Sequence, residues 1–169
     1  MGKIQSQIII ITAALLAVSC SRQTMSVEEL RVEHMENPSV VDATHPRLSW
    51  INIPKSQKAR GIKQTAYRIV VASSMENLKQ GTYDLWDSGK QLSEESDLIS
   101  YQGKTLPSAQ DCYWKVQTWD QDGKPTAWSK PSYWGMGIMN ENEWQAQWIA
   151  PLLGGPGAPL LRKHFDSEG

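Results

Sequence analysis

Histidine and cysteine are scarce in this sequence, and their scarcity excludes two kinds of site. The three histidines, His34, His45 and His164, share no metal-ligand spacing, so we expect no metal site. The two cysteines are Cys20 and Cys112. If Cys20 carries a lipid, Cys112 has no partner and the exported protein has no internal disulfide.

Charge of one sign and long apolar runs are also lacking. The formal net charge is −1 and charged residues make up 21% of the chain, so no basic surface points to nucleic acid. The sustained apolar run Ile8–Val18 is too short to span a bilayer as a helix. We expect no membrane-spanning segment after it.

This apolar run belongs to an amino-terminal leader. It comes after a positive region at Lys3 and ends at a serine next to Cys20, which predicts a helical signal peptide over residues 1–19. The end resembles a bacterial lipoprotein signal, in which Cys20 carries the lipid, although Ala17 stands where leucine is commoner. A plain secretory signal is the alternative. Acyl chains on Cys20 would anchor the protein in the cell envelope, at the periplasmic or the surface face of the outer membrane.

Beyond a polar tether over residues 20–27, apolar residues recur at every second position, which predicts strands. The alternating positions are Leu30 and Val32; Leu48 and Trp50; Tyr67, Ile69 and Val71; Ile99 and Tyr101; Trp114, Val116 and Thr118; Trp134 and Met136. Only residues 73–80, SSMENLKQ, resemble a helix. About seven short strands at this spacing predict an all-β sandwich of two sheets over residues 28–139.

The stretch DCYWKVQTWDQDG, residues 111–123, combines aromatic rings with carboxylates, so it is either a sugar-cleaving site or a core strand with its turn. A glycosidase needs two opposed carboxyl groups. Asp120 and Asp122 precede Gly123 at an expected hairpin turn, where aspartate serves the turn and stays in water. The DQDG run also lacks the later glutamate of a calcium loop. We therefore expect a core strand and turn, no catalytic residue and no metal.

Tryptophan is plentiful, with eight copies against a single phenylalanine. Trp50, Trp114 and Trp134 share the phase of apolar neighbours and are expected in the core. The others are candidates for contact with a glycan or another domain: Trp86, Trp119, Trp128, Trp144 and Trp148. They could form a sugar-stacking platform or the surface against which further domains dock. We favour docking, because exposed apolar patches usually mark interfaces.

The character of the chain changes after the expected sandwich. Residues 140–159 are interpreted as a linker that ends in GGPGAP, and residues 160–169 as the truncated start of a second β-domain. The glycine-rich run lacks the Lys-Ser/Thr ending of a phosphate loop. No cofactor is expected.

Several pieces of the chain resemble one family when taken in order. They are NPSVVDATHPRLSW, QTAYRIVVAS, DLWDSGK, YWKVQTWDQDGKPTAWS, and WQAQWIAP followed by PLLRKHF. Together they resemble the amino-terminal region of bacterial α-L-rhamnosidases, glycoside hydrolase family 78, from about Leu30 to Phe165. Val40-Val41 departs from the Leu-Gly pair that is common in the family. The resemblance implies a fibronectin type III-like sandwich that precedes a second β-domain and an (α/α)6 catalytic barrel.

The sandwich pattern includes an expected corner between the sheets. Leu106-Pro107 precedes an aromatic strand, as at the corner that a tyrosine usually fills in such domains. Trp114 or Tyr113 could take this place, and the alternation favours Trp114.

The resemblance implies a non-catalytic accessory module of a lipid-anchored α-L-rhamnosidase. The family's catalytic carboxylates belong to the barrel, which this chain lacks, so the chain as given is expected to be inactive. Its expected partners are the missing carboxy-terminal domains, the membrane through the lipid, and rhamnose-containing plant glycans. A free-standing envelope module that binds glycan or a protein through exposed tryptophans is the alternative. A third hypothesis is a truncated remnant without function.

Overall fold

A computed structural model describes residues 24–56 and 60–147 of the chain. The predicted leader, Cys20 and the segment 148–169 lie outside these described residues. Within the described ranges no helix is both long and apolar enough to cross a membrane.

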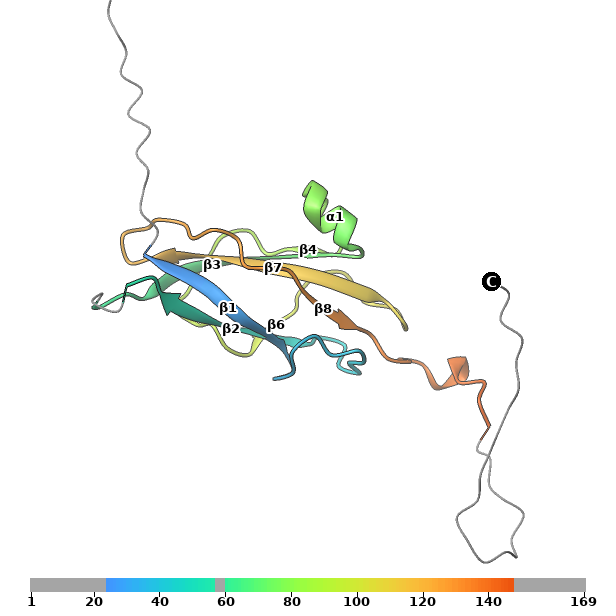
Figure 1. The fold of residues 1–169 in the computed structure, drawn as a ribbon. Helices are drawn as coiled ribbons and strands as arrows, with labels where there is room; N and C mark the ends of the chain where they lie inside the picture. Colours follow the sequence, from blue (N-terminus) through green and yellow to red (C-terminus); the bar gives the residue numbers. More distant parts are fainter. Residues whose placement is uncertain (1–23, 57–59, 148–169) are drawn as a thin grey trace, which may run out of the picture.

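The described chain is built mainly of antiparallel strands. Their bounds are β1 Met25–Val32, β2 Arg47–Pro54, β3 Gln64–Ala72, β4 Trp86–Asp87, β5 Gln91–Leu92, β6 Ile99–Ser100, β7 Asp111–Asp120 and β8 Ser132–Gly135; the helices are α1 Met75–Gln80 and the 3-10 turn η1 Glu141–Glu143. One sheet has the order β1-β2-β6 and the other β4-β3-β7-β8, with β5 also paired to β3. The two sheets lie face to face (Figure 1). The expected all-β sandwich is confirmed.

The core lies between the two sheets, and β7 supplies its centre. The side chains of Trp114, Val116 and Thr118 are fully buried on the inner face of this strand. Trp50 on β2 and Trp134 on β8 are buried too, and the rings of Trp114 and Trp134 meet edge to face with centroids 6.4 Å apart. The strict alternation along β7 therefore sets the inner layer, as the sequence predicts.

Strand β1 begins earlier than the sequence predicts. Met25 and Val27 fall inside the predicted tether, yet both are buried and paired to β2. The pairing register shifts between Glu28 and Arg31, and Glu29 has a positive φ of 49°. This β-bulge moves the buried phase by one residue before Leu30. The broken period conceals the first half of the strand, and the predicted tether over 20–27 is wrong from Met25 onward.

Helix α1 covers part of the outer face of the larger sheet (Figure 1). Ser74 caps its start by accepting a hydrogen bond from the Asn77 amide, and Gly81 ends it in the left-handed conformation. Leu78 of the helix packs against Val70 and Ala72 of β3. The helix explains why β3 is buried on both faces.

A tyrosine fixes the chain before β7, but it is neither of the residues expected there. The buried Tyr101 hydroxyl donates to the carbonyl oxygens of Leu85 and Lys104, at 3.2 and 2.9 Å. The indole N–H of Trp114 has no hydrogen-bond partner among the described residues, and Tyr113 lies on the outer face against Tyr133. The expectation of Trp114 or Tyr113 at the corner is wrong, because the side chain that donates to the backbone carbonyls there is that of Tyr101.

The described chain enters and leaves the sandwich at opposite ends. Strand β1 starts at one end of the long axis, and the segment after β8 leaves at the other (Figure 1).

Candidate functional site

Asp120, at the end of β7, is a buried carboxylate. Only 1% of its surface is exposed, and it accepts hydrogen bonds from the Thr24 hydroxyl at 2.7 Å and from the amides of Asp122 and Lys124 at 3.0 and 2.9 Å. Burial raises the pKa of Asp120, but these hydrogen bonds together hold it below its usual value. The expected turn is present, with Gly123 at φ 73°, but the expectation that Asp120 stays in water is wrong. It is a structural anion.

The other shifted carboxyl groups also favour the ionised form. Among the described residues, the acidic groups with a clearly shifted pKa are Glu33, Asp84, Asp87 and Asp120, and each is lowered. The hydrogen bond from Arg47 lowers the pKa of Glu33 most, and the one from Arg68 does so for Asp87. A general acid of a glycosidase needs a raised pKa. None of these four carboxyl groups has this property.

The four predicted contact tryptophans that the structure describes lie in different surroundings. Trp86 on β4 packs edge to face on Tyr101 at 5.2 Å and borders the core. Trp119 lies on the outer face of β7, with the Lys90 ammonium 4.6 Å from its ring centroid. Trp86 and Trp119, which the sequence analysis placed in one exposed group, therefore lie in different environments.

The remaining three members of that group lie elsewhere. Trp128, between β7 and β8, is half-buried beside Tyr83 on the outer face of the larger sheet. Trp144, just after η1, is 55% exposed at the end where the chain leaves. Trp148 lies outside the described residues.

Two cations lie against the ring of Trp128. The Lys115 ammonium is 5.0 Å and the Arg68 guanidinium 5.8 Å from its centroid. Arg68 also forms a two-pronged ion pair with Asp87, with bonds of 2.9 and 2.6 Å. Each cation–ring contact stabilises by about 0.5–1 kcal/mol at a partly exposed site. This cluster fixes the position of Trp128.

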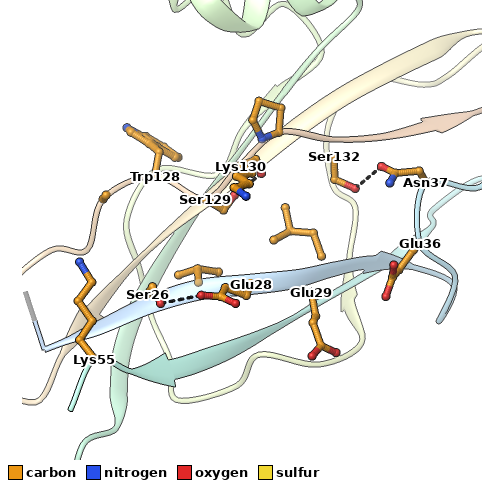
Figure 2. Close-up of a pocket in the computed structure, with 14 residues that line it drawn as sticks. Ser26, Glu28, Glu29, Glu36, Asn37, Lys55, Trp128, Ser129, Lys130 and Ser132 are labelled. Carbon is orange, nitrogen blue, oxygen red and sulfur yellow. Dashed lines mark hydrogen bonds between the residues drawn. The ribbon is translucent and has the colours of Figure 1, made fainter.

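A groove of about 530 Å³ runs between β1 and the segment that precedes β8 (Figure 2). Ser26 donates to Glu28 on one wall, and Ser132 donates to Asn37 on the other. Trp128 stands at its rim (Figure 2). Hydroxyls, carboxylates and an amide beside an indole can bind a polar ligand. The same charges and the β1 bulge also protect an open sheet edge from pairing with another strand.

An apolar hollow of about 700 Å³ lies at the exit end. Its exposed large apolar members are Val40 at 64%, Trp144 at 55% and Ile138 at 49%. Sequence reasoning missed Val40 and Ile138 as surface residues. The only signal was that Val40 stands at the departure from the family's Leu-Gly pair.

The topology defines the class of domain. A three-strand sheet β1-β2-β6 that faces an antiparallel sheet β4-β3-β7-β8 is the immunoglobulin-like or fibronectin-like sandwich. Residues 27–140 match the family described as Rha78A-like, N-terminal immunoglobulin domain. The chain belongs to this family.

Similar proteins are much longer than this chain. An α-L-rhamnosidase of Streptomyces avermitilis is 43% identical over 128 residues, which cover 74% of this chain and 12% of that protein. One of Formosa agariphila is 34% identical over 144 residues, covering 80% and 15%. The chain thus spans about an eighth of these relatives and matches only their amino-terminal immunoglobulin-like domain.

Solved structures agree with this assignment. The crystal structure of the Streptomyces avermitilis α-L-rhamnosidase complexed with L-rhamnose superimposes with a TM-score of 0.68 and 40% identity, over 75% of this chain and 12% of that one. The α-L-rhamnosidase from Dictyoglumus thermophilum gives 0.69 and 37%, over 74% and 14%.

Proposed function

We propose that this chain is a non-catalytic accessory module at the front of a lipid-anchored α-L-rhamnosidase. The main support is that residues 27–140 match a family of amino-terminal domains. The similar proteins are α-L-rhamnosidases. In this proposal the sandwich braces the catalytic part of the parent enzyme, and that part hydrolyses terminal α-L-rhamnose. The lowered pKa values of the shifted carboxyl groups support a structural role for the sandwich itself.

A domain exchange tests the bracing role. The amino-terminal domain of the Streptomyces avermitilis enzyme is deleted in one variant and replaced by residues 24–147 of this chain in another. We expect the deletion to lower the melting temperature of the enzyme and the replacement to restore it, whereas an unrelated sandwich of equal size does not. Equal melting temperatures for the intact enzyme, the deletion, the replacement and the unrelated-sandwich variant would contradict the proposal. Residues 21–169 alone should release no rhamnose from an aryl rhamnoside.

The lipid anchor has its own test. Cells that express the chain are labelled with a fatty acid, and Cys20→Ser is compared with Cys112→Ala, which leaves the leader intact. We expect Cys20→Ser to abolish labelling and move the protein out of the envelope membrane fraction, and Cys112→Ala to keep both. A chain that is exported but never labelled would indicate the plain secretory signal.

The groove favours glycan binding as a second candidate function. Trp128 stands at its rim, and the groove presents hydroxyl, carboxylate and amide groups, which suit hydrogen bonding of a sugar. Binding of residues 21–169 to a rhamnose-containing polysaccharide should be lost in Trp128→Ala and kept in Trp119→Ala, since Trp119 does not line the groove. Equal binding by both variants would reject the groove.

A further inference from the structure

Five apolar side chains line the hollow at the exit end, and we name this set the exit patch: Val40, Met136, Ile138, Met139 and Trp144, of which Met136 is buried. All but Val40 belong to the stretch through which the chain leaves β8. Val40 is held beside it because the Val41 amide donates to Gly135 and the Gly137 amide donates to Val41, both at 2.8 Å. The exit patch is therefore preformed by backbone hydrogen bonds.

The exposure of this patch differs from that of scattered surface residues. Single exposed apolar side chains are normal on soluble domains. Here Val40, Ile138 and Trp144 are each about half exposed or more, and they share one hollow. A contiguous apolar hollow of this kind usually marks an interface. Its rim also carries two carboxylates, Asp42 and Glu141.

We infer that the exit patch seats residues 148–169 of this chain, the first part of the polypeptide beyond the sandwich. The segment opens with the apolar run Trp148–Leu153. It begins directly after Gln147, three residues beyond Trp144, so a short extended span returns it to the patch. Tethering at this distance gives the segment a high effective concentration there.

Charge favours the same occupant. The adjacent Arg162 and Lys163 form a local basic pair in the segment, whose formal net charge is zero because Asp166 and Glu168 follow. Asp42 and Glu141 place negative charge in the lining of the hollow. Opposite charges at a rim orient a docking segment and select against wrong partners. The matching relatives extend far beyond the length that this chain covers, so a seat at the exit would join the sandwich to the later domains of such an enzyme. The inference rests on the proposed accessory role and deepens it by assigning its docking face.

Hydrogen exchange followed by mass spectrometry tests the seat on residues 21–169. We expect the amides of 148–153 to exchange at least about tenfold more slowly than in an unstructured peptide. Ile138→Asp should remove this protection. The matched control is Leu92→Asp, because Leu92 is 85% exposed on β5 and outside the patch, and it should keep the protection.

A second patch variant and a folding control accompany this experiment. Val40→Asp is the second patch variant, and unchanged protection of the β7 amides shows that each variant is folded. Unprotected 148–153 amides in the unmutated chain, or protection that both patch variants retain, would overturn the inference. Protection that rises with protein concentration would assign the patch to a second copy and overturn it too. The exchange experiment involves no enzyme. If residues 148–153 are unprotected while the domain exchange restores the melting temperature, the docking inference is refuted and the proposed accessory role stands.

Discussion

Removal of the buried Asp120 carboxylate should lower the free energy of unfolding. This side chain joins Thr24, ahead of β1, to the turn at 122–124 through three hydrogen bonds of 2.7–3.0 Å. A hydrogen bond to a charged group contributes about 1.5–3 kcal/mol, and bonds to one carboxylate do not add fully. We expect Asp120→Ala to lower the free energy of unfolding by about 3 kcal/mol. For a domain of this size the melting temperature falls by about 12 °C.

Urea unfolding followed by tryptophan fluorescence measures this loss, and Asp122→Ala is the matched control. Asp122 lies in the same turn but is exposed, so its substitution should change the free energy of unfolding by no more than about 0.5 kcal/mol. Equal stabilities of the two variants would refute the reasoning.

The pH dependence gives an independent check through Asp120→Asn. The pKa of Asp120 is lowered in the folded state, so the unfolded chain binds the proton more readily. The stabilisation is therefore complete above the unfolded pKa of about 3.9 and is lost as the pH falls through the lower folded value. The difference in unfolding free energy between the unmutated chain and Asp120→Asn should be constant from about pH 5 to 7 and shrink below about pH 4. A difference that stays constant down to pH 3 would show that the charge contributes nothing.

Three further outcomes are expected from changes in the core. Gly103→Ala should lower the free energy of unfolding by about 2 kcal/mol, because its new Cβ would lie 2.5 Å from the Leu85 carbonyl oxygen and the Trp86 Cβ; an unchanged urea midpoint would contradict this close contact. Tyr101→Phe removes the bonds to two carbonyls and should cost about 1–2 kcal/mol in the same assay, with a neutral result counting against its role as a staple. Burial raises the pKa of Cys112 to about 12, so in residues 21–169 a thiol reagent at pH 8 should label it only on unfolding, and rapid labelling of the folded chain would disprove its burial.

The sequence predicts the fold best where one face of a strand is buried without interruption. In β7 the alternation of Trp114, Val116 and Thr118 continues to Asp120, and all four are buried. The phase alone therefore points Asp120 inward. The usual role of aspartate in turns predicts a solvated carboxylate instead. The strand period gave the correct prediction, because a buried carboxylate at a turn can accept hydrogen bonds from the turn amides.

Other features depend on contacts that no local pattern contains. The bulge at Glu29 interrupts the period of β1 and hides its start at Met25. Tyr101 fills its role because the carbonyls of Leu85 and Lys104 come within reach. Such partners are fixed only when distant segments assemble.

Strand phase predicts which tryptophans are buried, but it does not predict what surrounds the others. Strand phase correctly separated the core tryptophan Trp114 from the outward-facing Trp119. It could not reveal that Trp128 would meet two cations. Val40 and Ile138 lie far apart in the sequence, and the backbone bonds around Gly137 bring them together in one hollow.

The placement of the two chain ends has a mechanical consequence. Strand β1 runs along the long axis from the entry end, and the chain leaves at the far end (Figure 1). If the amino end is held at a membrane, as proposed above, tension from a load on the carboxyl side would act along β1. Its bonds to β2, paired from Met25 with Pro54 to Val32 with Leu48, would be loaded together in shear rather than unzipped one at a time. A sandwich loaded in this way would resist extension through all of these bonds acting together.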